Sequence, residues 1–315
     1  MAVTWHNHES CGFVVLNNPP VNAINHNMRE GLISAVKWAK REKLERVILS
    51  GSGHGFAAGA DTKEFDHPPV SPHLPDVINC IEASTVPWIA AIHGAALGGG
   101  GELALGCRYR IARADATIGF PEVILGLVPG AGATQRLPRL IGLTEALKLI
   151  PTGKTISGRA AMAIGLVDAI DDDPINAAKL IDQKILSELV PLNLAKAGAD
   201  ETVNYDAARQ IAIRRMRGQE APLTAISLLE MAQTTTFDDG MQKERTAFLA
   251  LRASSQARAL RHIFFTERAA KKPPKAIAKQ KFNLKQLDHV MVIGGGTMGS
   301  GIAYAFLNAN IRVTI

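Results

Sequence analysis

The sequence predicts an α/β protein whose second half is helical and whose last residues form a short β-α-β segment. Two apolar runs, 47–51 and 86–93, each lead through a turn of small residues into a helix-like segment, the alternation expected of α/β folds. Apolar residues then recur at helical spacing through most of 204–266. Finally, a glycine-rich turn at 294–299 separates a strand pattern from a helix pattern.

In chain order, the first predicted strand covers 11–16, and an irregular turn at 17–24 leads to a helix around 27–43. After the two apolar runs, short strands are predicted at 108–113 and 116–119. Further helical patterns, punctuated by Pro222 and Gly240, cover 131–150, 158–168, 174–190, 204–217, 221–235 and 239–266.

Composition excludes several classes of protein. The 315 residues, 47% of them hydrophobic, are enough for a large core and for two domains. There is no run of 18 apolar residues to predict a membrane span, and the N-terminus lacks the basic start and apolar stretch of a secretory signal. Cys11, Cys80 and Cys107 indicate reduced thiols in a cytosol-like compartment, and we expect all three to be small core residues. Neither they nor the histidines have metal-site spacing, and His93 is expected to be structural.

The formal net charge of +6 does not predict nucleic-acid binding. Seven cations and no acid lie between Arg268 and Lys285, and removing these seven from +6 leaves −1. No basic surface interleaved with aromatic residues is evident elsewhere, so the basicity belongs to a predicted linker around the Lys-Pro-Pro-Lys run at 272–275. Some of these cations could contact a phosphate, but a solvated linker is the simpler interpretation.

The most informative local feature is a run of four glycines, 98–101, that leads directly into Glu102. It follows the predicted strand 86–93 and precedes a helix-like segment, so its unpaired amides and the helix dipole favour an anion or a developing oxyanion. A second acid, Glu122, follows in a Phe-Pro-Glu turn. The glycines could instead only allow close helix packing, and Glu102 could only stabilise a helix start.

A second loop has a similar composition. The small residues at 57–60 follow the strand 47–51 and permit close approach of the backbone to a ligand. Two such loops could each donate one amide hydrogen bond to a single oxygen, as in an oxyanion hole. The side chain of Asp61, directly after this loop, is more simply interpreted as a helix N-cap.

Three blocks of sequence, 56–61, 93–102 and 120–137, together resemble the enoyl-CoA hydratase (crotonase) family, and the resemblance covers roughly 1–190. It implies a core of ββα turns stacked as a spiral, followed by C-terminal helices. It also implies that the amides of Ala60 and Gly99 bind a thioester oxygen, and that Glu102 and Glu122 flank the double bond of the substrate.

The reaction implied by this resemblance is hydration of trans-2-enoyl-CoA to 3-hydroxyacyl-CoA in fatty-acid β-oxidation, without any cofactor besides the coenzyme A of the substrate. Polarising the thioester makes the β-carbon electrophilic, and two carboxyl groups in different protonation states can then deliver water and a proton. We assign Glu102 to the water and Glu122 to the α-carbon. Relatives that only move a double bond generally need one carboxylate, so the presence of two favours hydration. Δ3,Δ2-enoyl-CoA isomerisation is the main alternative. A non-catalytic acyl-CoA-binding module is a further alternative.

The resemblance extends to coenzyme A contacts, partners and location. The candidate contacts for the coenzyme A moiety are Val21, Ala23, Ala58, Asp61, Phe265 and Arg268. Stand-alone crotonases tend to form trimers, whereas in fused enzymes a linker helix can occupy the equivalent surface, so a trimer or a monomer is expected. We expect a cytoplasmic protein, or a peroxisomal one in a eukaryote.

A second motif lies near the end of the chain. Gly294, Gly296 and Gly299 form G-x-G-x-x-G between a strand pattern and a helix pattern, the fingerprint of a dinucleotide-binding Rossmann segment. The order of these parts resembles multifunctional β-oxidation enzymes that join a hydratase to a 3-hydroxyacyl-CoA dehydrogenase. We therefore expect an incomplete NAD-binding segment with negligible NAD affinity and no dehydrogenase activity, NAD serving only a full-length parent. The expected domains are a crotonase-like core, a helical region, a basic linker and this segment, at 1–190, 191–270, 271–285 and 286–315.

Overall fold

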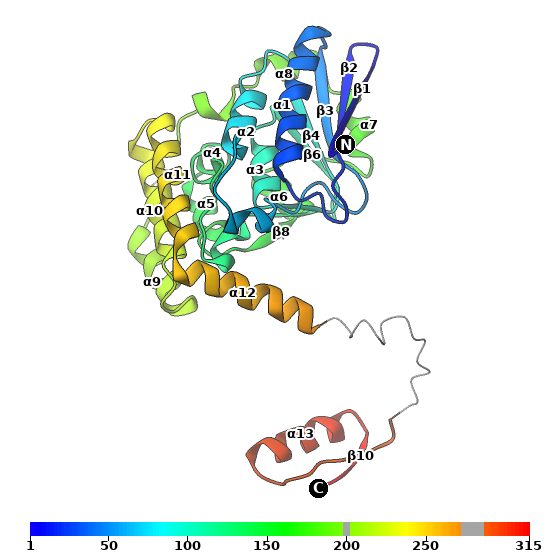
Figure 1. Cartoon of the computed structure of the whole chain (residues 1–315), viewed down its shortest axis with the longest axis vertical. Coiled ribbons are helices and arrows are strands. Elements are labelled where there is room, and N and C mark those ends of the chain that lie inside the picture. Colours follow the sequence, from blue (N-terminus) through cyan, green and yellow to red (C-terminus); the bar gives the residue numbers. More distant parts are fainter. Residues whose placement is uncertain (198–201, 272–286) are drawn as a thin grey trace. The chain divides into compact units, whose positions relative to one another are not determined.

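The computed structural model describes residues 1–197, 202–271 and 287–315, which form two compact units, Met1–Phe265 and Thr266–Ile315 (Figure 1). The α/β class predicted from the sequence is confirmed. The core and the helical region lie together in the first unit, and the predicted linker 271–285 falls almost entirely outside the described residues. Within the described residues, no helix combines the length and the hydropathy that a membrane span requires.

The first unit is built on a six-stranded sheet. Its strands are β1 (Val3–His8), β2 (Cys11–Leu16), β3 (Arg46–Gly51), β4 (Trp88–Ile92), β6 (Tyr109–Ala112) and β9 (Ala169–Ile170), in that spatial order. All neighbours are parallel except β1 and β2. Every residue of β4 is buried, as expected for a parallel strand covered on both faces. Strand β1, which is mostly exposed and lies at the edge of the sheet, was not identified from the sequence.

A smaller sheet of three strands, β5 (Ala95–Leu97), β7 (Thr117–Gly119) and β8 (Thr155–Ser157), accompanies the large one. The chain passes from β4 through β5 into α3 (Gly99–Leu105), and from β6 through β7 into the 3-10 helix η2 (Pro121–Leu125). These are two successive ββα turns, as the family resemblance implied. The sequence pattern predicts that β4 leads directly through a turn into a helix, so β5 was missed.

Several predicted helices are interrupted in the structure. The pattern 131–150 forms α4 (Ala133–Ile141) and α5 (Leu143–Leu149), because Gly142 between them has a φ of +80°. The pattern 239–266 forms α11 (Phe237–Ala253) and α12 (Ser255–Ala270), which meet at an extended Ser254. Gly240 lies inside α11 rather than at a break. The helix has glycine there because a Cβ atom would lie 2.0 Å from Gln135 Oε1. The remaining helices are α1 (His26–Arg41), α2 (Leu74–Glu82), α6 (Gly158–Ala163), α7 (Pro174–Lys179), α8 (Gln183–Glu188), α9 (Tyr205–Arg215) and α10 (Ala221–Thr234), with 3-10 helices η1 (Thr62–Asp66) and η3 (Leu192–Leu194).

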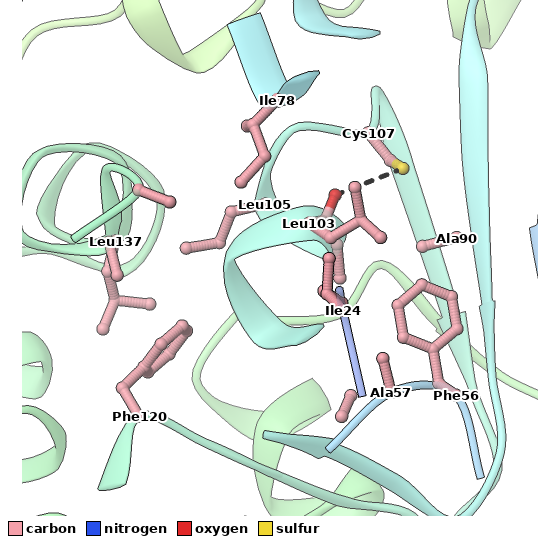
Figure 2. Packing of buried hydrophobic residues seen from close by; sticks show 14 of the residues in the cluster. Ile24, Phe56, Ala57, Ile78, Ala90, Leu103, Leu105, Cys107, Phe120 and Leu137 are labelled. Carbon is pink, nitrogen blue, oxygen red and sulfur yellow. Dashed lines mark hydrogen bonds between the residues drawn. The ribbon is translucent and has the colours of Figure 1, made fainter. Parts of the chain in front are cut away.

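Helix α3 passes through the centre of the main core. Leu103 and Leu105 on this helix are buried among apolar side chains from other elements, including Ile78 of α2 and Leu137 of α4 (Figure 2). Burial of such side chains removes apolar surface from water and is the main term that holds these elements together. The catalytic candidates that α3 carries are therefore fixed to a rigid support.

Only one of the three cysteines is a fully buried core residue. Cys107 is buried and donates to the Leu103 carbonyl oxygen at 3.6 Å. Cys11 is half-buried and Cys80 is exposed, so the expectation that all three lie in the core was wrong. Cys80 is exposed because α2 turns Val77 and Ile81, not position 80, toward the core.

The second unit contains a β-α-β segment of β10 (His289–Met291), α13 (Thr297–Asn308) and β11 (Arg312–Thr314), with β10 and β11 parallel. This is the arrangement predicted from the glycine fingerprint. Gly296 is the N-cap of α13.

Candidate active site

A cavity of about 560 Å³ in the first unit brings the predicted catalytic residues together. Ala60, Gly98, Gly99, Glu102 and Glu122 all line it, although they come from different loops and helices. Its apolar wall is formed by Phe65, Leu74, Leu125, Leu127 and Phe248. The cavity therefore combines two carboxyl groups and free backbone amides with a surface suited to an acyl chain.

Two backbone amides from residues that line this cavity lie close together. The Ala60 nitrogen lies 3.3 Å from the position that a Cβ atom on Gly99 would occupy. Within the described residues, neither the Ala60 nor the Gly99 amide donates a hydrogen bond. Gly59 and Gly98, directly before them, have φ values of +102° and +52°, which favour glycine. Two unpaired amides on neighbouring residues of one cavity lining are suited to binding an oxygen that gains negative charge.

The four glycines serve two purposes. The sequence pattern predicts that they form a turn before the helix, but α3 begins at Gly99 with Gly98 as its N-cap, so most of them form its first turn. A Cβ atom on Gly100 would lie 2.2 Å from the Ala57 carbonyl oxygen, and one on Gly101 would lie 2.9 Å from the Phe120 ring. The later glycines thus allow close packing, while Gly98 and Gly99 line the cavity.

Glu102 is bound at one end by backbone. Its side chain is 3% exposed, and its Oε1 accepts hydrogen bonds from the amides of Ala131 at 2.8 Å and Ala133 at 3.1 Å. Burial raises the pKa of the Glu102 carboxyl, while these amides and the charges of Arg136 and Arg245 act in the opposite direction. Glu102 therefore has several partners that favour its ionised form.

Glu122 is in a different environment. Its Oε2 is buried, and among the described residues it has no hydrogen-bond partner. Burial, followed by the negative charge of Glu102, raises the pKa of Glu122 well above its usual value. Its Oε1 lies 2.9 Å from the position of a Cβ atom on Gly98, so Gly98 leaves room for this carboxyl group. Two carboxyls in one cavity thus differ in how readily they lose a proton.

A third buried carboxyl, Glu244 of α11, was not identified from the sequence. Its oxygens accept from the Gly132 amide at 2.6 Å, and from the Thr134 amide at 2.9 Å and hydroxyl at 2.6 Å. Burial, and then the charge of Glu102, raises the pKa of Glu244 to about 8. The sequence signal was available, because Glu244 interrupts the apolar stripe that Gly240 and Phe248 share at helical spacing.

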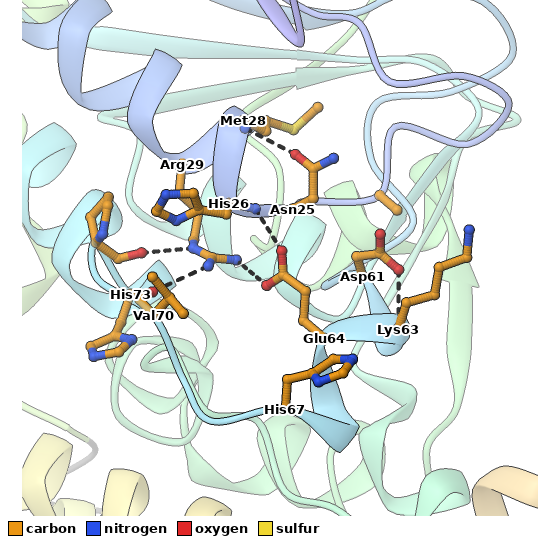
Figure 3. Close-up of polar contacts among 12 residues, drawn as sticks. Asn25, His26, Met28, Arg29, Asp61, Lys63, Glu64, His67, Val70 and His73 are labelled. Carbon is orange, nitrogen blue, oxygen red and sulfur yellow. Dashed lines mark hydrogen bonds and ion pairs between the residues drawn. The ribbon is translucent and has the colours of Figure 1, made fainter.

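Two arginines hold the loop that forms one side of the cavity, and these were also missed. Arg29 of α1 donates to Glu64 at 2.7 Å and to the Pro72 carbonyl oxygen at 2.7 Å (Figure 3). Arg252 of α11 donates to the carbonyl oxygens of Glu64 at 2.7 Å and Phe65 at 3.0 Å. Because each arginine binds several acceptors in a fixed geometry, the loop has a defined shape.

The structure places the coenzyme A candidates unevenly. Ala58 lines the cavity, and its amide donates to the Val21 carbonyl oxygen at 3.0 Å, so these two are neighbours. Val21, Ala23 and Asp61 lie on these two loops but outside the cavity lining. The Asp61 side chain accepts from the Lys63 amide, which confirms it as an N-cap. Phe265 is 43% exposed on α12 and is not part of the lining. The sixth candidate, Arg268, belongs to the second unit.

The glycine turn of the second unit has the features of a nucleotide fingerprint. A Cβ atom on Gly299 would lie 1.7 Å from the Gly294 carbonyl oxygen, so α13 approaches the turn closely. No atom lies within 4 Å of the position that a Cβ atom on Gly296 would occupy, so the backbone is accessible there. Across the described ranges, no cluster of histidine, cysteine or acidic residues could hold a metal ion.

Comparison with known proteins gives consistent matches. A model of the enoyl-CoA hydratase/isomerase family matches residues 6–220. The chain is 39% identical over 319 residues to the peroxisomal bifunctional enzyme of Cavia porcellus and 37% identical to that of Homo sapiens, covering 96% and 97% of the chain. It is 34% identical to the peroxisomal fatty acid beta-oxidation multifunctional protein of Oryza sativa. The chain spans 44% of the length of each of these relatives.

Solved structures share the fold of the chain. An enoyl-CoA hydratase from Thermoplasma volcanium is 28% identical with a TM-score of 0.56, and the match covers 83% of this chain and 97% of that one. An enoyl-CoA hydratase/isomerase from Pseudoalteromonas atlantica has a TM-score of 0.63 at 22% identity, with 85% and 98% covered.

Proposed function

The chain belongs to the enoyl-CoA hydratase/isomerase family, and on that premise we propose that it hydrates trans-2-enoyl-CoA to 3-hydroxyacyl-CoA. The names of the relatives from rice and other plants place those proteins in fatty-acid β-oxidation, which we propose as the setting for this reaction. The observation that carries this proposal is one cavity lined by two unpaired amides and two carboxyl groups of different acidity.

The amides of Ala60 and Gly99 bind the thioester oxygen. Hydrogen bonds from these amides withdraw electrons from the conjugated double bond, so that C3 becomes electrophilic. They also stabilise the enolate oxygen after attack, and each such donor contributes about 3 kcal/mol of transition-state stabilisation in other enzymes. Their proximity supports this assignment, because one oxygen must receive both hydrogen bonds.

The two carboxyl groups move the protons. Glu102, whose amide donors favour its ionised form, takes a proton from water as the water oxygen bonds to C3. The C2–C3 π electrons move to the thioester oxygen. When the carbonyl re-forms, C2 takes the proton of Glu122, whose raised pKa keeps it protonated. Proton exchange with water then returns both groups to their initial states.

Coenzyme A enters this reaction as part of the substrate, and hydration requires no further cofactor. We propose Val21, Ala23, Ala58, Asp61, Phe265 and Arg268 as contacts of the coenzyme A moiety. Ala58 has the best support because it lines the cavity beside Ala60. We further propose that the protein acts as a monomer or a trimer, without nucleic acid, in the cytoplasm or, in a eukaryote, in the peroxisome.

The second unit has a separate proposed role. The turn that contains Gly294, Gly296 and Gly299 suits the pyrophosphate group of NAD, a cofactor that accepts a hydride when bound. The relatives named bifunctional are about twice as long as this chain. We assign this turn to dinucleotide binding in a longer enzyme and derive no step of hydration from it.

A hydration assay across C4 to C16 trans-2-enoyl-CoA tests the proposal. We expect loss of the absorbance of the conjugated enoyl-thioester and formation of the 3-hydroxyacyl product. A 3-enoyl-CoA substrate, from which isomerisation would produce that absorbance, serves as the second arm. Conversion of the 3-enoyl substrate alone would replace the hydratase assignment with an isomerase, and binding without turnover of either would indicate a non-catalytic module.

A further inference from the structure

Glu102 and Glu244 share one run of backbone. The amides of Ala131 and Ala133 donate to Glu102, while those of Gly132 and Thr134 donate to Glu244. The two carboxyl groups thus hold alternate amides of 131–134, the segment in which α4 begins. Glu102 lines the cavity, whereas Glu244 does not, so Glu244 binds this run from outside the cavity.

Glycines allow α11 to come close enough for this contact. A Cβ atom on Gly240 would lie 2.0 Å from Gln135 Oε1, and one on Gly130 would lie 2.6 Å from the Phe248 ring. Gly132 has a φ of +110°, and a Cβ atom there would lie 2.0 Å from the Arg136 guanidinium. The carboxyl of Glu244, itself fully buried, is therefore enclosed by a closely packed contact between α11 and 130–136.

We propose that Glu244 is a positioning residue for hydration: it fixes the 131–134 run so that its other two amides orient and stabilise the Glu102 carboxylate. The inference rests on the proposed function. If one carboxyl is removed, the amides it bound must find other partners or remain unpaired in the interior, which costs free energy. The run then shifts, and Glu102 with it.

Glu244 also acts through its charge. The groups that face it are Glu102, Glu122 and the neighbouring Arg245. Because the pKa of Glu244 is about 8, it gains its negative charge only as pH rises toward that value, and that charge then raises the pKa of Glu122 less than burial and the charge of Glu102 do. Arg136, at the same turn, acts on Glu102 in the opposite sense. Replacing Glu244 by a neutral residue should therefore lower the pKa of Glu122, which acts as the acid, at the basic pH values where Glu244 is ionised. Activity is lost as that acid ionises, so the basic limb of the pH profile moves to lower pH.

The test is steady-state hydration by the full chain carrying Glu244→Gln, measured across pH. We expect kcat to fall about 10-fold to 100-fold, the loss typical of a misplaced catalytic group, with a smaller change in KM. The basic limb should move to lower pH. The control is Asp168→Asn. Like Glu244, Asp168 accepts a hydrogen bond from a backbone amide, that of Arg110 at 2.8 Å, and it also pairs with the Arg110 guanidinium at 2.8 Å, but it lies outside the cavity lining. Its pH limb should coincide with that of the wild type.

A second pair of variants covers the case in which Glu244→Gln does not fold. Thr134→Val removes the hydroxyl that donates to Glu244 at 2.6 Å, and Thr134→Ser keeps it. We expect Thr134→Val to lower kcat and Thr134→Ser to restore most of the loss. If the wild type hydrates enoyl-CoA but the folded variants show the same kcat and the same basic limb, the role of Glu244 is wrong while the proposed function stands. A wild-type protein that does not hydrate any enoyl-CoA overturns the proposed function as well.

Discussion

The amide nitrogen of Ala60 lies 3.3 Å from the point at which a side chain on Gly99 would begin. One residue follows a strand of the large sheet and the other begins a helix after the small sheet, so the ββα arrangement brings their amides together. A side chain on Gly99 would therefore lie close to the Ala60 amide and, in the proposed site, would enter the space that the thioester oxygen requires.

Gly99→Ala should therefore weaken the binding of the thioester oxygen. The added methyl group would lie 2.8 Å from Leu74 Cδ2, as well as close to the Ala60 amide. We expect kcat to fall about 100-fold, the loss seen when one oxyanion donor is removed. Difference infrared spectroscopy of bound carbonyl-labelled enoyl-CoA should show a smaller shift of the carbonyl stretch to low frequency. Gly301→Ala, at a helical glycine with open space around it, should leave both measurements unchanged.

Gly98→Ala should displace Glu122. Position 98 has a φ of +52°, and the new Cβ atom would lie 2.9 Å from Glu122 Oε1. We expect a loss of stability of about 1–3 kcal/mol from the strained backbone and a large loss of hydration. Gly53→Ala is the matched control, because it has a φ of +71° but nothing within 4 Å of its Cβ position. If both variants lost hydration equally, backbone strain and not the position of Glu122 would be the cause.

The raised pKa of Glu122 should make stability depend on pH. A carboxyl whose pKa is higher in the folded state stabilises the fold fully below its unfolded pKa, and this contribution is lost as pH rises through the folded pKa. Gln does not titrate, so the unfolding free energy of Glu122→Gln relative to the wild type should increase with pH above about 4.5, near the unfolded value. Urea unfolding at several pH values measures this. Parallel curves for the two proteins would contradict it.

The ion pair of Arg136 and Glu82 should be important for stability. The two side chains are 0% and 3% exposed and lie 2.7 Å apart, and Arg136 also donates to the Ala131 carbonyl oxygen. Arg136→Met leaves the Glu82 charge buried without its partner, so we expect a loss of about 3–5 kcal/mol in the unfolding free energy. By contrast, breaking the exposed pair of Arg113 and Asp115 by Asp115→Asn should have little effect. Chemical denaturation of both variants checks the difference.

Much of the fold could be predicted because its signals are local. The strand predicted at 11–16 coincides with β2, the apolar run at 47–51 covers all of β3 except Arg46, and the run at 86–93 contains β4. Short apolar runs rich in β-branched residues and bounded by glycine or proline favour buried strands over helices. The glycine blocks likewise identified the loops that line the cavity, since a need for small residues is visible in the sequence itself.

The features that were missed depend on contacts distant in the sequence. Glu244 and Arg252 reach the cavity region only because α11 lies against the start of α4 and against η1. Nothing in the residues that flank Glu244 indicates which amides it will bind. The break between α11 and α12 at Ser254 was missed for a related reason, because apolar periodicity continues through it while the backbone becomes extended.

The turnover of Glu102→Gln and Glu122→Gln, measured with the dissociation constant for the acyl-CoA, tests the central claim most directly. Each substitution keeps the size of the side chain and removes its capacity to transfer a proton. We expect kcat to fall about 10²-fold to 10⁴-fold in each variant, with little change in the dissociation constant. Hydration at close to the wild-type rate in either variant would show that this carboxyl does not take part in the reaction, and would contradict the proposed two-carboxyl mechanism.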